Sequence, residues 1–260
     1  MRHFWHWLLW VLATAGLLQL YFVLRIAAMV VVDPQSTAFQ RSEAWRVASD
    51  TGALPWRQQW LPYGQISNHL KRAVIASEDD GFAQHDGVDW DALEKAWQKN
   101  SRAQQRIERQ QEQLARAQEK AAQNSPGRTQ PAAVVKPPKV VGGSTITQQL
   151  AKNLFLSGER TLLRKGQEFV LTLLLEAVLS KQRILEIYLN SVEWGEGVFG
   201  AEAAAQHYYR KSAAQLSAAQ AARLAVLLPR PKYFEKLPNS AYVAARSAVI
   251  LGRLTSAELP

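Results

Sequence analysis

The chain contains no cysteine among its 260 residues. This absence excludes a disulfide framework and any metal site built from thiolates, although it does not decide the cellular compartment. No segment alternates apolar and polar residues with period two, which argues against half-buried strands and favours an almost entirely helical fold. The sequence Ser-x-x-Lys is also absent, which excludes the serine acyl-transfer site that this motif forms. The histidines lack His-Glu-x-x-His spacing, so we do not expect a zinc site.

Positive charge is in excess and unevenly placed. The formal net charge of +9 suggests by itself an anionic partner. Residues 98–139 carry nine Lys or Arg against three Glu, so +6 of that charge lies in one segment. Its first part is rich in Gln, Arg, Glu and Ala and its second part in Pro, which predicts a solvated helix followed by a linker. The segment could bind anionic lipid or nucleic acid, but we favour the simpler interpretation of a solvated insertion.

The N-terminus contains a long apolar run. Residues 7–24 include only two polar side chains, Thr14 and Gln19, and the run reaches about the 20 residues that a bilayer requires if it is extended to residue 4. Tryptophan and tyrosine lie near its two ends, as in membrane spans. A cleaved signal peptide is the alternative, because Ala13-Thr14-Ala15 resembles a cleavage site. Apolar residues continue well past that point, so we expect an uncleaved anchor with the following domain outside the cytoplasm.

These features predict three parts. Residues 1–32 would form a cytoplasmic tail and transmembrane anchor, residues 33–65 an extended membrane-proximal connector, and residues 66–260 a domain with the insertion at about 98–139. Apolar spacing and helix-start signals predict the helices of this domain. They begin at Ser67 and near Asp89, cover Leu162–Tyr188, begin again at Ala201, and cover Ala213–Leu228 and Tyr242–Leu254.

The segment Gly142–Phe155 is the most informative one. Two glycines and several hydroxyls precede apolar residues at helical spacing, so Ser144 or Thr145 is a candidate N-cap. A helix that begins here would point free N–H groups and its positive dipole end at a ligand. Ser144, Gln148 and Lys152 would line one exposed face, which suits a phosphate or a sugar. An ordinary capped amphipathic helix is the alternative, and the local pattern does not decide between them.

Glu78 is a candidate for acid–base chemistry. It follows Leu70 and Val74 at helical spacing, so its carboxylate would lie on the apolar stripe of a helix. Burial raises the pKa of a carboxyl group, which suits a general acid or base. Because Gly81 follows so closely, an acidic turn that faces water is the simpler interpretation of the local pattern.

Arg164, Lys165 and Glu168 form a second charged group. Arg164 and Glu168 share a helix face, with the arginine before the glutamate. This order is the less favourable one for a surface ion pair, which is a mild argument that the pair does more than stabilise a solvated helix. Two cations and a carboxylate on one turn could hold a pyrophosphate, with a divalent metal as a further option. The alternative is a solvated charged turn.

Residues 195–200 match the string Gly-x-Gly-x-x-Gly. We reject a dinucleotide site, because a predicted helix precedes the string and no βαβ unit surrounds it. A turn between helices is the favoured interpretation.

Four motifs follow one another between residues 78 and 190. They are Glu78-Asp79-x-x-Phe82-x-x-His85-x-Gly87-x-Asp89, Gly143-Ser144-Thr145-Ile146-Thr147-Gln148-Gln149-x-x-Lys152-Asn153, Arg164-Lys165-x-x-Glu168 and Ile184-Leu185-Glu186-x-Tyr188-x-Asn190. In this order they resemble the peptidoglycan glycosyltransferases of glycosyltransferase family 51, and the chain looks like a monofunctional biosynthetic member. The connection between the first two motifs is much longer here than is usual in the family. The chain is too short for the transpeptidase domain of bifunctional relatives.

The resemblance implies a mainly α, lysozyme-like glycosyltransferase domain behind one N-terminal transmembrane helix, with lipid II and the nascent glycan strand as substrates. It implies that Glu78 is the general base for attack by the acceptor's 4-hydroxyl on C1 of the chain's terminal MurNAc, with inversion and release of undecaprenyl pyrophosphate. Glu168 would be the second carboxylate and would help to hold the pyrophosphate or a Mg²⁺ or Mn²⁺ ion. The substrate and pyrophosphate would be bound by Ser144, Thr145, Gln148, Gln149, Lys152, Arg164 and Lys165. The site would be organised by Asp79, Phe82, His85, Asn153, Glu186, Tyr188 and Asn190.

The same resemblance implies a single-pass protein of the bacterial inner membrane with a periplasmic catalytic domain. Its role would be cell-wall biogenesis and cell shape, with cell-wall synthesis or division proteins as partners and no nucleic acid. Two rival functions are weaker. A glycan-cleaving lytic transglycosylase or lysozyme-like enzyme would need no cation cluster for a diphosphate. A non-enzymatic membrane-anchored scaffold would need no ordered set of carboxylates and hydroxyls.

Overall fold

The computed structural model describes the chain except for residues 1, 55, 125–141, 157, 159 and 160. The chain divides into two compact units. One unit contains Met1–Val88 and Thr145–Pro260, and the other contains Asp89–Ser144.

The smaller unit is dominated by α4 (Trp90–Asn124), a single helix of 35 residues. We predicted one helix near Asp89 and a separate solvated helix in the insertion, and the structure joins them without a break. The proline-rich linker predicted for the rest of the insertion falls mainly outside the described residues.

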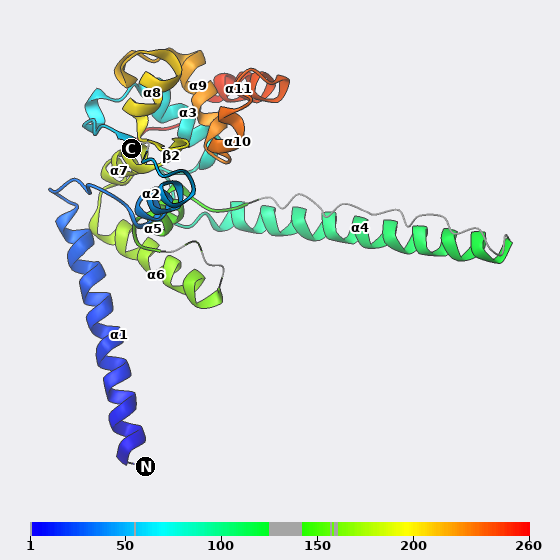
Figure 1. The fold of residues 1–260 in the computed structure, drawn as a ribbon, viewed down its shortest axis with the longest axis horizontal. Helices are drawn as coiled ribbons and strands as arrows, with labels where there is room; N and C mark the ends of the chain where they lie inside the picture. Colours follow the sequence, from blue (N-terminus) through cyan, green and yellow to red (C-terminus); the bar gives the residue numbers. More distant parts are fainter. Residues whose placement is uncertain (1, 55, 125–141, 157, 159–160) are drawn as a thin grey trace. The chain divides into compact units, whose positions relative to one another are not determined.

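The larger unit is mainly helical, as predicted, and its strands are short (Figure 1). They form one three-stranded sheet in the order β1-β3-β2, in which β1 is parallel and β2 antiparallel to β3. The helices are α1 (Arg2–Ala28), α2 (Ala38–Thr51), α3 (Asn68–Glu78), α5 (Ile146–Phe155), α6 (Leu162–Val178), α7 (Lys181–Ser191), α8 (Ala201–Tyr209), α9 (Ala218–Leu227), α10 (Pro231–Glu235) and α11 (Ala241–Arg253). The remaining elements are β1 (Arg57–Gln58), η1 (Tyr63–Gln65), β2 (Glu193–Gly195), β3 (Val198–Phe199) and η2 (Ala213–Gln215).

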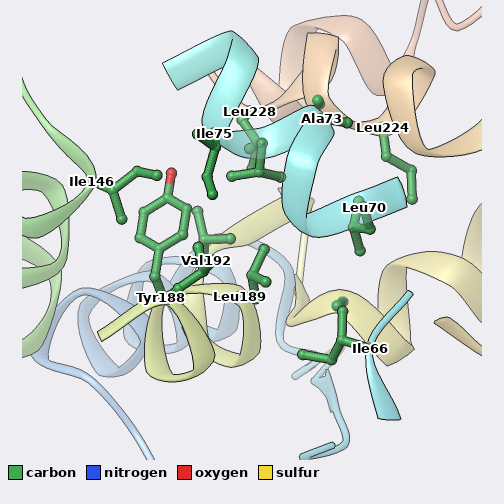
Figure 2. Close-up of a cluster of buried hydrophobic side chains, with 14 of the residues drawn as sticks. Ile66, Leu70, Ala73, Ile75, Ile146, Tyr188, Leu189, Val192, Leu224 and Leu228 are labelled. Atoms are coloured by element: carbon green, nitrogen blue, oxygen red, sulfur yellow. The ribbon is translucent and has the colours of Figure 1, made fainter. Parts of the chain in front are cut away.

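The core lies around α3, which packs against α9 and α11. Ser67 caps this helix by accepting a hydrogen bond from the His69 N–H, so the predicted start is confirmed. Leu70 and Val74 are fully buried. Figure 2 shows side chains of α3, α5, α7 and α9 meeting in one cluster, in which the ring of Tyr188 lies beside Ile146. The last turn of α3 and the first turn of α5 therefore share one packed environment.

Several predicted elements differ from the structure. The extended conformation expected for residues 33–65 is wrong for Ala38–Thr51, which form α2, because Thr37 and Gln40 make a capping box. The helix expected over Leu162–Tyr188 is interrupted where Ser180 caps α7. The helix expected over Ala213–Leu228 is likewise divided, since Ser217 caps α9. The string at residues 195–200 is a hairpin rather than a simple turn between helices: Gly195 ends β2, Gly197 lies between β2 and β3, and Gly200 is the N-cap of α8.

The N-terminal helix α1 contains a stretch, His3–Ala28, that is long and apolar enough to cross a membrane. Within the described residues it is the one helix that meets this description, and most of its surface is exposed. The structure is therefore consistent with a single-pass membrane anchor.

Asn190 fastens the chain that leads into α3 to α7. Its buried amide accepts a hydrogen bond from the Leu61 N–H at 2.8 Å and donates to the carbonyls of Leu61 and Glu186, both at 2.9 Å. An Asn190→Ala variant is expected to lose about 2 to 3 kcal/mol of unfolding free energy, because buried backbone groups lose their partners. Urea titration measures the change. A loss well below 1 kcal/mol would contradict this bracing role.

Candidate active site

Glu78 is the last residue of α3 and is partly buried. Its Oε2 accepts a hydrogen bond from Gln149 Nε2 at 3.0 Å, and Ser77 Oγ lies 3.5 Å from its Oε1. Burial raises the pKa of the Glu78 carboxyl, while the Gln149 and Ser77 hydrogen bonds and the charge of Arg246 partly oppose the increase. The interpretation as a solvent-exposed turn is wrong for this residue. It offers a partly buried carboxylate of raised pKa, which suits a general base.

Tyr188 fixes the orientation of the amide that contacts Glu78. Its hydroxyl donates to Gln149 Oε1 at 2.9 Å, so Gln149 Nε2 must face Glu78. Complete burial raises the pKa of Tyr188 well above the ordinary tyrosine value, so its hydroxyl stays protonated and remains a donor. The chain Tyr188–Gln149–Glu78 thereby connects α7, α5 and α3 at the candidate base.

A Gln149→Leu variant is expected to show its acidic loss of activity at higher pH than the parent protein. A general base works in its charged form, and the Gln149 N–H stabilises that form and lowers the Glu78 pKa. Removing the Gln149 amide therefore raises the pKa of Glu78 further. The fall of kcat/KM on the acidic side of the pH profile, its acidic limb, then occurs at higher pH. The measurement is the pH dependence of glycan synthesis by both proteins. An unshifted or downward-shifted limb would contradict the assignment.

Asp79, the next residue, connects α3 with the start of α5. Its Oδ2 accepts a hydrogen bond from the Ile146 N–H at 2.9 Å, and its Oδ1 lies 2.8 Å from His85 Nε2. A carboxylate at a helix N-terminus is stabilised by the unpaired N–H groups and by the helix dipole. The anion at the N-terminus of α5 in this structure is therefore Asp79, whereas the sequence suggested a phosphate or sugar ligand as one of two interpretations.

His85 and Gly87 complete this connection. The Gly87 N–H donates to His85 Nδ1 at 3.1 Å, so the ring of a neutral histidine carries its proton on Nε2 and donates to Asp79. The Gly87 carbonyl accepts a hydrogen bond from Thr145 Oγ1 at 2.6 Å. Glycine is required here, because φ is +85° and a Cβ would lie 2.8 Å from side-chain atoms of Thr172 and Glu176.

Thr145, rather than Ser144, is the N-cap of α5. Its Oγ1 accepts a hydrogen bond from the Gln148 N–H, and Gln148 Oε1 accepts one from the Thr145 N–H. Gln148 is consequently buried, so the exposed face predicted for Ser144, Gln148 and Lys152 is wrong at its central position. Ser144 and Lys152 are exposed. The side chains of Thr145 and Gln148 are thus used to begin α5.

The cation cluster lies on the first turns of α6. Glu168 is buried and pairs with Arg164 at 3.2 Å and with Lys165. The predicted Arg164–Glu168 pair is confirmed, and the cluster keeps a net positive charge. The side chain of Lys165 is 54% exposed, so it can reach a ligand outside the protein core. Within the described residues Arg164 Nε is buried without a hydrogen-bond partner, which leaves one donor available.

The remaining predicted residues have mainly supporting positions. Phe82 is fully buried, and Lys181 Nζ lies 4.7 Å from the centre of its ring. Asn153 is buried on α5, and Glu186 pairs with Arg183 at 3.2 Å on α7. Asn190 braces the chain as described above.

A metal site made only of protein ligands does not fit these residues. No group of three or more His, Asp or Glu side chains that could hold an ion occurs in the described part of the chain. Both carboxylate oxygens of Glu168 contact cationic side chains. The use of Mg²⁺ or Mn²⁺ stays a prediction, and we derive no step through a metal.

Sequence reasoning missed two contributions. Arg246 of α11 acts electrostatically on Glu78, although 168 residues of chain separate them and no local pattern marks it. Thr147 donates to Glu176 at 2.5 Å, and Lys181 pairs with the same carboxylate at 2.7 Å. Through Glu176, these contacts connect α6 with Thr147 of α5 and with Lys181 of α7.

Known proteins are similar to this chain over most of its length. The family model described as Transglycosylase matches residues 48–118 and 128–255. A biosynthetic peptidoglycan transglycosylase of Burkholderia thailandensis is 52% identical over 242 residues, which cover 93% of this chain and 82% of the relative. Proteins of the same description from Herminiimonas arsenicoxydans and Janthinobacterium sp. are 51% identical over 94% of this chain and 91% of their own length. The chain therefore belongs to the transglycosylase family, among the biosynthetic peptidoglycan transglycosylases.

Proposed function

We propose that this peptidoglycan transglycosylase polymerises glycan chains with Glu78 as its general base. The partial burial of Glu78 and its contact with Gln149 carry the proposal, since they provide an oriented carboxylate with a raised pKa. In the reaction, Glu78 takes the proton of the acceptor sugar's 4-hydroxyl on lipid II. The 4-oxygen then bonds to C1 of the growing chain's terminal MurNAc, while the bond from C1 to the pyrophosphate oxygen breaks.

Arg164 and Lys165 are the groups that suit the leaving pyrophosphate. Undecaprenyl pyrophosphate departs with the electron pair of the broken bond, so negative charge grows on its bridging oxygen in the transition state. Cations that are already in place stabilise the transition state, in which this charge has grown, more than they stabilise the bound substrate. Glu168 holds both cations through its ion pairs and therefore acts as a positioning residue. Attack from the face opposite to the leaving group inverts C1 and gives a β-1,4 linkage.

Asp79 and His85 organise this site without taking part in bond changes. Their oxygens and nitrogens already have partners in α5 and at Gly87. Because Asp79 directly follows Glu78, its attachment to α5 fixes the backbone of the base. Thr145 and Gln148 maintain the start of α5, while Ser144 and Lys152 are exposed and suited to contact sugar or phosphate.

The test uses the purified full-length protein in detergent with lipid II as the substrate. Long glycan strands on a gel are the expected product. A parallel sample receives preformed peptidoglycan, which a lytic enzyme would cleave. Cleavage without polymer would overturn the proposal in favour of a glycan-cleaving function, and the absence of both activities would favour a scaffold.

We also propose that the domain faces the periplasm. A long domain follows α1, and its proposed product is a strand of the cell wall, which lies outside the cytoplasmic membrane. The chain lacks cysteine, so a single exposed cysteine, such as Ala219→Cys on α9, can report the side. Labelling of spheroplasts by a membrane-impermeant thiol reagent is expected. Labelling only after the membrane has been broken would contradict this orientation.

A further inference from the structure

The last third of the anchor is packed against the catalytic domain. Phe22, Ile26 and Met29 are buried at helical spacing, whereas almost every earlier residue of α1 is exposed. Gln19 begins this packed stripe. Its Nε2 donates to Gln167 Oε1 at 3.0 Å, and Gln167 Nε2 lies 3.4 Å from Gln19 Oε1. A polar side chain in the apolar run thus forms a reciprocal amide pair with α6.

Other contacts make this attachment rigid. The rings of Phe22 and Phe155 meet edge to face with their centres 5.3 Å apart. Arg183 donates to the carbonyls of Met29 at 2.8 Å and Val32 at 3.2 Å. The anchor therefore enters the domain as a docked helix, with α6 alongside it (Figure 1).

The position of Gln19 in the span determines the depth of α6. A span of about 20 residues that begins as early as Phe4 still extends to Val23, which is about 6 Å along the helix beyond Gln19. A later start places Gln19 deeper. Since Gln19 and Gln167 are hydrogen-bonded, the first turns of α6 must lie at or below the boundary between headgroups and acyl chains.

Most exposed side chains of α6 are apolar, as contact with the acyl chains of the bilayer would require. Leu162 and Leu163 in its first turn are 92% and 86% exposed, and Val170 and Leu173 are also exposed. Such a concentration of exposed apolar side chains is unfavourable in water and favourable against acyl chains. Lys165, whose side chain is 54% exposed, lies in the same turns, where a long cationic side chain can reach lipid phosphates.

We propose that the Gln19–Gln167 pair sets the depth at which α6 enters the lipid bilayer. The partner of the α6 surface formed by Leu162, Leu163, Val170 and Leu173 is the leaflet from which the domain protrudes. The pair thereby holds Arg164 and Lys165 at the height of a lipid-linked pyrophosphate. This last step rests on the proposed function, whereas the depth of α6 does not.

Depth can be measured because the chain has no native thiol. A spin label on Leu163→Cys is placed in vesicles of phosphatidylethanolamine and phosphatidylglycerol, and its relaxation by oxygen is compared with that by a water-soluble nickel chelate. Oxygen access should dominate at residue 163, and chelate access should dominate for the same label on Ala219→Cys of α9. Gln19→Leu should raise chelate access at residue 163. A label at residue 163 that is as open to the chelate as the α9 label would overturn the proposal.

Thr14→Leu is the matched control. It also removes a polar group from the span, but the Thr14 hydroxyl donates to the Trp10 carbonyl of its own helix at 2.8 Å. Residue 163 should keep its depth in this variant. An equal shift in both variants, or no shift in Gln19→Leu, would show that the amide pair does not set the depth.

Kinetics test the connection with catalysis. Gln19→Leu should raise KM for lipid II by about threefold with little change in kcat, which is the size of effect that one hydrogen bond between helices in a membrane gives. Gln167→Leu should act alike, and the double variant should lose no more than either single variant. Additive losses, or a shifted depth with unchanged KM, would remove the catalytic role. Absence of polymerisation by the parent protein would count against the proposed function, while the label depth would still test the position of α6.

Discussion

Replacing Glu78 with glutamine is expected to lower kcat for glycan polymerisation by about 10²- to 10⁴-fold. Glutamine keeps the size of the side chain and can still accept a hydrogen bond from Gln149, but it cannot take a proton from the acceptor hydroxyl. KM for lipid II should change little, because the proton transfer stabilises the transition state and not the bound substrate. Steady-state rates with saturating lipid II provide the measurement.

Asp80→Asn is the matched control for this variant. It makes the same change from carboxylate to amide two residues further on, at an exposed side chain that pairs with Arg253 at 2.7 Å. This control should polymerise at close to the parent rate, and both variants should show the helical circular dichroism of the parent. Equal losses in both variants, or a Glu78→Gln protein with the parent rate, would remove Glu78 from the mechanism.

Replacing Lys165 with methionine is expected to lower kcat by about 10²-fold, the effect of removing one preorganised group that stabilises transition-state charge. The fold should survive, because the Lys165 side chain is largely exposed and Arg164 continues to pair with Glu168. The loss should be smaller for a substrate whose leaving group carries less charge. Comparison of rates with lipid II and with such an analogue tests the role directly.

Lys236→Met, which removes another exposed lysine from the same unit, is the control for net charge. Its rate should match that of the parent. If Lys165→Met and Lys236→Met lose activity equally, the effect arises from overall charge and the cluster has no special role at the leaving group.

Local patterns predicted the parts of the site that depend on nearby residues. The helix start at Ser67 and the apolar spacing of Leu70 and Val74 placed Glu78 on the apolar stripe of a helix, although the nearby glycine made a turn that faces water the simpler interpretation. The pair of Arg164 and Glu168 followed from helix geometry alone, since residues four apart share a face. In each case the partners lie within about three turns of one helix, so short-range rules apply.

The contacts between helices could not be predicted in this way. Asp79 lies at the N-terminus of α5, where the sequence suggested a ligand, and Gln149 faces Glu78 because Tyr188 holds it there. These partners come from three helices, and only the packing of the core brings them together. Gln148 looked available for a ligand for a different, local reason: its side chain suits either a ligand or a capping box, and the conformation of Thr145 decides between them.

The attachment of Asp79 to Ile146 has a consequence for how the chain tolerates its long connection. The two residues are 67 positions apart, so folding must close a large loop before the base is fixed. The entropy of closing a loop grows only with the logarithm of its length, and each doubling costs about 0.6 kcal/mol. Lengthening this connection has therefore cost the site little stability. Evolution can vary the segment between the first two motifs without moving the carboxylate that begins the reaction.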